Sequence, residues 1–123
     1  MPEKDEDVLA FVSATVKSIW ALELLLLMYR ERNRAWQTEE LVRELRASTV
    51  VVREALASLA GSGLIATDEA GGFGYRPASE QLDAFVGAAQ ALYNAKPLAV
   101  INAIATAPNE KLRIFAEAFR LKE

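Results

Sequence analysis

The side chains of this sequence that could do chemistry are carboxylates, hydroxyls, lysines and arginines, because its 123 residues include no histidine and no cysteine. An imidazole base, a thiolate nucleophile and the usual zinc sites are therefore absent. The acidic residues alternate with Lys and Arg along the expected helical faces, which is the ordinary pattern of a solvated surface. We therefore expect a protein that is not an enzyme and that uses no cofactor and no metal.

Arginine side chains gather in the middle of the sequence and could bind phosphate groups. They are Arg30, Arg32, Arg34, Arg43, Arg46 and Arg53. Guanidinium groups clamp phosphates and pair with guanine, so a patch of this kind is a candidate nucleic-acid contact. The first three also lie at the end of an expected helix, where favourable interaction with the helix dipole is an equally good interpretation.

Residues 38–77 have the pattern of two short helices followed by a β-hairpin. Thr38 is the expected N-cap of the first helix and Ser48 that of the second, since a hydroxyl oxygen accepts hydrogen bonds from the free N–H groups of a helix start. Gly61 or Gly63 ends the second helix. The buried stripes of the two helices are Leu41, Val42, Leu45, Val52, Ala55, Leu56 and Leu59.

The hairpin is expected to follow the second helix directly. Strands are predicted over 64–67 and 73–76, with a Gly-Gly turn between them. Trp36, in the short stretch before the first helix, is expected to add a small third strand. The order of elements predicts a winged helix-turn-helix over 36–77, so that the fold is mostly α with a small β-hairpin wing.

Residues 5–34 predict one long N-terminal helix or two nearly continuous ones, with an apolar stripe that includes Val8, Ile19 and Leu26. Beyond Ile19 apolar residues occupy all sides of the helix, so this part must be buried on more than one face. One face can pack on the helix-turn-helix. The other needs either the C-terminal helices or a second chain.

Residues 79–122 predict C-terminal helices that flank the core. Ser79 is the expected N-cap of the first, Pro97 starts the second, and Pro108 or Asn109 starts the last. With 123 residues the chain is expected to form a single domain over 1–123.

The segment from Ser48 to Leu56, followed by Leu59 and by 63–65, resembles the recognition-helix segment of the GntR-type bacterial repressors. That segment has the general form Ser-Arg-Thr-Pro-Val-Arg-Glu-Ala-Leu, and MarR-like regulators share a looser version of the pattern. The resemblance covers residues 38–77. It implies a bacterial DNA-binding transcriptional regulator that reads DNA with the helix starting at Ser48.

The same resemblance implies which residues contact DNA. Ser48, Thr49 and Arg53 fall at positions where the family commonly contacts it. Val50 can contact a thymine methyl group, and arginines nearby can bind phosphates. The predicted DNA-binding residues are Ser48, Thr49, Val50, Arg53, Arg46, Arg43 and Arg76.

A second hypothesis is a winged helix that contacts a protein and does not bind DNA directly. Residues 36–78 contain four arginines and six carboxylates, and the expected wing tip carries Asp68 and Glu69. DNA binding draws most of its strength from phosphate neutralisation, so this balance is unfavourable for a monomer. We therefore expect a homodimer, which would double the basic patch and match two half-sites. Alternatively, Val50 and Val51 would form part of an apolar docking face for a protein partner.

No stretch of the sequence approaches the roughly 20 apolar residues of a membrane span. The acidic N-terminus does not resemble a signal peptide. With no cysteine there are no disulfides either. We therefore expect a cytoplasmic protein that does not contact a membrane.

Overall fold

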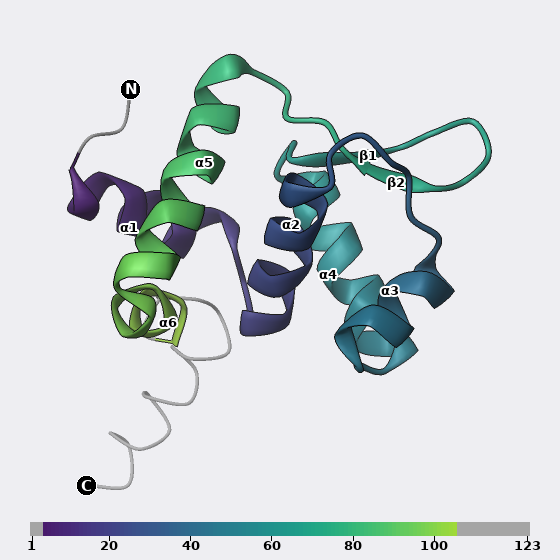
Figure 1. Ribbon diagram of the computed structural model, residues 1–123, viewed down its shortest axis with the longest axis horizontal. Coiled ribbons are helices and arrows are strands. Elements are labelled where there is room, and N and C mark those ends of the chain that lie inside the picture. The colour runs from purple at the N-terminus through teal and green to yellow at the C-terminus, as the bar shows by residue number, and fades with distance from the viewer. Residues whose placement is uncertain (1–3, 106–123) are drawn as a thin grey trace, which may run out of the picture.

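The computed structural model describes residues 4–105, which are mostly helical and include one small antiparallel sheet (Figure 1). The elements are α1 (Asp5–Thr15), α2 (Ile19–Arg30), α3 (Thr38–Leu45), α4 (Thr49–Gly61), β1 (Ile65–Thr67), β2 (Phe73–Tyr75), α5 (Glu80–Ala95) and α6 (Pro97–Ala105). In Figure 1, α2 lies between α1, α5 and α6 on one side and α3, α4 and the hairpin on the other. The last predicted helix, from Pro108 or Asn109, lies outside the described residues.

The N-terminal segment forms two sharply bent helices, so the prediction of one long or nearly continuous helix over 5–34 is wrong. α1 and α2 are bent by 110° at the break between them. Val16 adopts an extended conformation, and the Ser18 hydroxyl oxygen accepts a hydrogen bond of 3.0 Å from the N–H of Ala21. A polar cap inside the apolar stripe thus starts a new helix. The turn also leaves Ile19, which the stripe predicted to be buried, 37% exposed.

The helix α2 is the centre of the hydrophobic core. Its buried side chains point to all sides of the helix and are Ala21, Leu22, Leu24, Leu25, Leu26, Leu27 and Met28. They pack against α4, α3 and β2 on one side and against α5 on the other. The second apolar face of α2 is therefore covered by the same chain.

Each helix of the middle segment begins and ends at a defined residue. Gln37, and not the predicted Thr38, precedes the first turn of α3, and its N–H donates to the Glu40 carboxylate at 2.8 Å. Ser48 caps α4 as predicted, since its hydroxyl oxygen accepts from the N–H of Val51 at 3.2 Å. Gly63, with φ of 76°, terminates α4 by donating its N–H to the carbonyl of Ala60.

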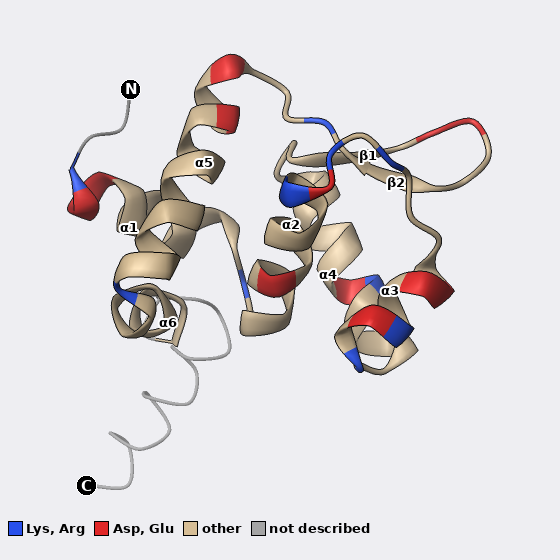
Figure 2. Ribbon diagram, viewed as in Figure 1, with Lys and Arg blue, Asp and Glu red and all other residues tan. Residues whose placement is uncertain are grey.

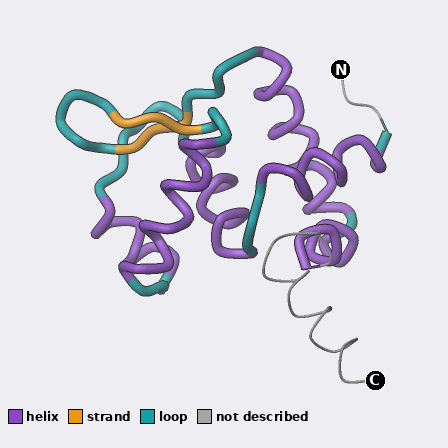
Figure 3. The backbone as a smooth tube through the Cα atoms, turned by 180° about the vertical axis from the view of Figure 1, so that it is seen from behind, coloured by secondary structure: helices purple, strands orange, loops and turns teal. Residues whose placement is uncertain are grey.

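The hairpin forms where it was predicted and pairs with the segment before α3. Ile65 lies opposite Tyr75 and Thr67 opposite Phe73 in the antiparallel register. Trp36 and Phe73 exchange backbone hydrogen bonds of 2.7 and 2.8 Å, so the expected third strand is present as a single β-bridge. Seen from behind, the strands and their loop project away from the C-terminal helices (Figure 3).

The C-terminal helices pack on the N-terminal one. Ser79 caps α5 by accepting from the N–H of Leu82 at 3.1 Å, and Pro97 is the first residue of α6, both as predicted. The rings of Phe11 and Phe85 stack with centroids 4.9 Å apart between α1 and α5. The helix α6 contacts both of these helices.

Within residues 4–105 no single helix is long and apolar enough to cross a bilayer. The helices α1 and α2 reach that apolar length only when they are taken together across their bend.

The central position of α2 predicts the effect of shortening its side chains. Leu25 is 1% exposed, so Leu25→Ala should lower the free energy of unfolding by about 2–5 kcal/mol through lost burial and a cavity. Leu98→Ala is the matched control, because Leu98 is 72% exposed and should cost less than about 0.5 kcal/mol. Urea unfolding followed by circular dichroism measures both. Equal losses in the two variants would contradict the packing of α2.

Candidate nucleic-acid interface

The first turn of α4 presents polar and apolar side chains to solvent on one face. Ser48, Thr49, Val50 and Arg53 are all exposed. Positions three and four apart lie on the same side of a helix, which places Thr49 and Val50 next to Arg53. The Ser48 oxygen already accepts the N–H of Val51, but its hydroxyl proton remains available to a phosphate oxygen.

The turn before α4 adds two exposed arginines. α3 ends at Leu45, and Arg46 then adopts the left-handed conformation with φ of 55°. Arg46 is the C-cap of α3 and Ser48 is the N-cap of α4, so Arg43, in the last turn of α3, and Arg46 lie at the end of α3 that leads into α4. Arg43 thus lies on α3, Arg46 on the turn between the two helices, and Arg53 on α4.

Among the described residues, the side chains of Arg43, Arg46, Arg53 and Arg76 form no ion pair and no hydrogen bond. All four are exposed. An arginine side chain with no intramolecular partner can use its five N–H donors on a ligand. These four guanidinium groups are therefore available for phosphate or base contacts.

Carboxylates lie close to the same arginines. Arg43 shares a shallow cavity of about 250 Å³ with Glu40 and Glu44, and Glu54 follows Arg53 directly on α4. Figure 2 shows acidic and basic positions side by side on α3. The local positive potential of this face is accordingly modest.

The loop of the hairpin is acidic and internally bonded. One oxygen of Asp68 accepts hydrogen bonds from the N–H groups of Ala70 and Gly72, at 3.0 and 2.8 Å. Glu69 is exposed beside it, and part of the loop between β1 and β2 is red in Figure 2. The carboxylate of Asp68 therefore serves the turn, and the loop presents no cation to a phosphate.

Arg76 does not share the surroundings of the other predicted contacts. It lines a separate cavity with residues 32–35 and with residues of the hairpin, and no residue of α3 or α4 lines that cavity. Of the seven predicted DNA-binding residues, six thus lie around the start of α4, and Arg76 lies beyond the end of β2.

Arg30, Arg32 and Arg34, whose role the sequence left open between helix dipole and phosphate contact, have intramolecular partners. α2 ends at Arg30, which donates to the side chain of Gln90 at 3.1 Å. Arg32 lies over the ring of Tyr29, with its guanidinium carbon 4.4 Å from the ring centroid. The last two arginines lie beyond the helix, so the helix dipole explains only the first.

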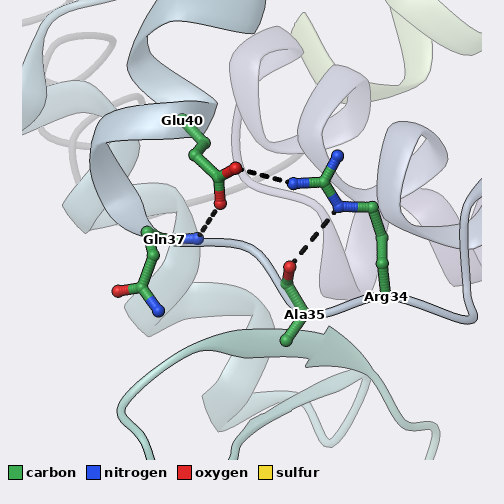
Figure 4. Close-up of polar contacts among 4 residues, drawn as sticks. All are labelled: Arg34, Ala35, Gln37 and Glu40. Atoms are coloured by element: carbon green, nitrogen blue, oxygen red, sulfur yellow. Dashed lines mark hydrogen bonds and ion pairs between the residues drawn. The ribbon is translucent and has the colours of Figure 1, made fainter.

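Arg34 joins the end of α2 to the start of α3 (Figure 4). Its guanidinium donates to the Glu40 carboxylate at 2.8 Å and lies 3.6 Å from the ring centroid of Trp36. The other Glu40 oxygen accepts from the N–H of Gln37. That backbone hydrogen bond, together with Arg34, lowers the pKa of Glu40. The contact fixes the turn that leads from α2 into α3.

An apolar surface lies beside α4 that the sequence indicated only in part. Val50 is 65% exposed and Trp20, at the start of α2, is 42% exposed. Trp20 and Val51 line a groove of about 300 Å³ between the two helices, together with Lys17 and Glu54. Val50 and Val51 were predicted as an apolar face, whereas Trp20 belongs to the stretch beyond Ile19 that was expected to be buried because apolar residues occupy all sides of the helix.

Among residues 4–105, no group of three or more acidic side chains could hold a metal ion. No protein-family model, no curated protein and no solved structure matches this chain. The function must therefore be argued from its own residues.

The Glu40 contacts predict a pH dependence of stability. Because the folded-state pKa lies below the usual 4.5, the contacts stabilise the fold above that pH. Their contribution is lost as the pH falls through the lower folded-state pKa. Glu40→Gln should therefore melt below the wild type at pH 7, and the two melting temperatures should converge in acid. Glu39→Gln, which removes an exposed carboxylate from the same turn, should change the pH 7 melting temperature less. A constant difference between wild type and Glu40→Gln at every pH would contradict this assignment.

Proposed function

We propose that this protein is a small DNA-binding transcriptional regulator that reads DNA with α4. The observation that carries the proposal is the exposed start of α4, where Ser48, Thr49 and Arg53 share one face and the Arg53 guanidinium has no partner among the described residues. An arginine in this position on a helix can pair bidentately with guanine in the major groove. The helix N-terminus and the Ser48 hydroxyl can bind a phosphate.

The order and pairing of the elements support a winged helix-turn-helix of the kind found in GntR-like and MarR-like regulators. The helix α2, the bridge at Trp36, α3, α4 and the hairpin follow one another as the helices, short strand and wing of that module do. In such modules the second helix of the pair enters the major groove. In this chain that helix is α4.

The charge of this surface sets the expected strength of binding. Arg43, Arg46 and Arg53 could each neutralise one phosphate, which gives a slope of log affinity against log salt of about −3 per protomer. Glu44 and Glu54 beside them reduce the affinity further. We therefore expect a homodimer that uses two copies of α4 on two half-sites, since the dimer doubles the number of contacts.

Arg53→Ala should weaken binding to genomic DNA fragments by about tenfold or more in a mobility-shift assay at low salt. Lys96→Ala is the matched control, because it removes one positive charge from the C-terminal end of α5 and should leave the affinity within about twofold of the wild type. Glu54→Gln should strengthen binding, since it removes a carboxylate next to Arg53. If the wild type binds no genomic fragment at low salt, DNA is not the partner.

A second candidate function, contact with a protein partner, is favoured by the apolar surface beside α4. Trp20 on α2 and Val50 on α4 are large apolar side chains that are exposed there, and the groove lined by Trp20 and Val51 lies between the two helices. Exposed aromatic side chains at the edge of a groove are typical anchors of protein interfaces. This surface would accept an apolar side chain of a partner without any phosphate contact.

Trp20→Ser separates the two functions, because Trp20 lies on α2 and not on α4. If a protein is the partner, this variant should lose the partner in co-purification while Leu98→Ser, at an exposed apolar position on α6, should retain it. DNA affinity should be unchanged in both variants. Retention of every protein partner by Trp20→Ser and by Val50→Asp would exclude this surface as the docking site. Circular dichroism checks that each variant is folded.

A further inference from the structure

A polar cavity lies between the segment that follows α2 and the β-hairpin. Its volume is about 310 Å³, at the lower end of the range for small-ligand sites. The side chains that give it its charge are those of Arg32, Arg34, Arg76 and Asp68. The lining residues thus carry three positive charges and one negative charge; Glu40 and Asp83, which do not line the cavity, pair with Arg34 at 2.8 Å and with Arg32 at 3.8 Å.

Aromatic rings hold two of the three arginines. Arg32 lies over Tyr29 and also 5.5 Å from the ring centroid of Tyr75, and Arg34 lies over Trp36 at 3.6 Å. Stacking engages the flat face of a guanidinium and leaves the N–H groups at its edge free to donate. The rings therefore position these cations at little cost in hydrogen-bonding capacity.

The three arginines retain unused donors. Arg32 gives one hydrogen bond of 3.3 Å to the carbonyl of Tyr29, and its ion pair with Asp83 is long, at 3.8 Å. Arg34 donates to Glu40 and to the carbonyl of Ala35. Each guanidinium has five N–H groups, so both keep several, and Arg76 keeps all five among the described residues.

Tyr75, which lines the cavity and lies near Arg32, is hydrogen-bonded to α5. The Tyr75 hydroxyl donates to the Asp83 carboxylate at 2.6 Å, and its ring meets that of Tyr29 edge to face. Burial, followed by the hydrogen bond to Asp83, raises the pKa of Tyr75, so this hydroxyl remains a donor at neutral pH. Asp83 is thereby shared between Tyr75 and Arg32.

Asp68 is the one acidic residue that lines the cavity, and its carboxylate is unfavourable for an anion there. One of its oxygens is engaged by the N–H groups of Ala70 and Gly72, which offset part of its negative charge. An asparagine at this position would keep an oxygen acceptor for both N–H groups and lose the charge. Asp68→Asn would therefore make the charge of the cavity lining more positive and Arg76→Gln would make it less positive. Neither substitution removes a hydrogen bond of the backbone.

From these contacts we propose that the cavity of Arg32, Arg34 and Arg76 binds the phosphate group of a ligand. Arginine N–H groups in a fixed arrangement match the oxygens of a phosphate. Three arginines from two segments of the chain line this cavity. None of the lining residues belongs to α3 or α4, so this site is additional to the DNA contact proposed for α4. Its phosphate comes either from a small phosphate-bearing ligand or from a nucleic-acid backbone.

Calorimetric titration of the full chain with inorganic phosphate and with a nucleoside monophosphate, in a low-salt buffer free of other oxyanions, tests the site. Arg76→Gln should weaken binding by about tenfold or more, because it removes a charge-assisted donor. Asp68→Asn should strengthen it several-fold. Lys4→Gln is the control: it removes one positive charge at the start of α1, outside both proposed binding surfaces, and should leave the affinity within about twofold of the wild type. Melting curves verify that all three variants fold.

Two results would overturn the proposal. One is the absence of binding of either probe to the wild type up to 10 mM, roughly the weakest affinity at which such a site would matter. The other is an equal loss in Arg76→Gln and Lys4→Gln, which would mean that only the overall charge of the protein determines the affinity.

Titration of the same variants with a short DNA duplex identifies the source of the phosphate. If Arg76→Gln weakens duplex binding as strongly as phosphate binding, the site holds a nucleic-acid backbone. If duplex affinity is unchanged while phosphate binding is lost, the site holds a small ligand. Because the phosphate titrations do not depend on duplex binding, the site and the DNA contact of α4 can fail separately.

Discussion

The burial of α2 on all its sides is the constraint on which the rest of the structure depends. A helix this apolar must be covered on opposite faces, and its neighbours supply the two halves of the molecule: α4, α3 and β2 on one side, α5 on the other. The bend at Ser18 is what allows this arrangement, since it directs α1 onto α5 and α6 and leaves both faces of α2 accessible. The surface beside the start of α4 lies at the N-terminal end of this helix, and the arginine-lined cavity lies at its C-terminal end.

At the C-terminal end of α2, contacts within the chain hold the side chains of a run of arginines in place. Arg32 and Arg34 stack on aromatic rings, and the Glu40 carboxylate links Arg34 to the first turn of α3. Rings hold guanidinium groups in place without consuming their N–H donors. The same contacts that fix the path from α2 into α3 therefore also leave an arginine-lined cavity beside the hairpin.

At the N-terminal end of α2 the surface has a different character. Trp20 lies beside the first turns of α4, where Val50 is exposed and Arg53 has no described partner. A base edge in the major groove and an apolar side chain of a partner protein both find complementary groups there. Which of the two is bound depends on whether the contribution of Arg43, Arg46 and Arg53 exceeds the repulsion from the neighbouring carboxylates.

The sequence by itself determined the local elements: Ser48 and Ser79 as helix caps, a helix end at Gly61 or Gly63, the hairpin, and the exposed polar face of α4, because each follows from the chemistry of a few consecutive residues. It could not determine the 110° bend before Ile19, since Ser18 interrupts an apolar stripe whose period continues on both sides. Only the tertiary structure decided that α5 covers the second face of α2, and that Arg76 joins Arg32 and Arg34 rather than Arg53. These are contacts between residues far apart in the chain, which the packing of whole elements sets and which no local pattern records.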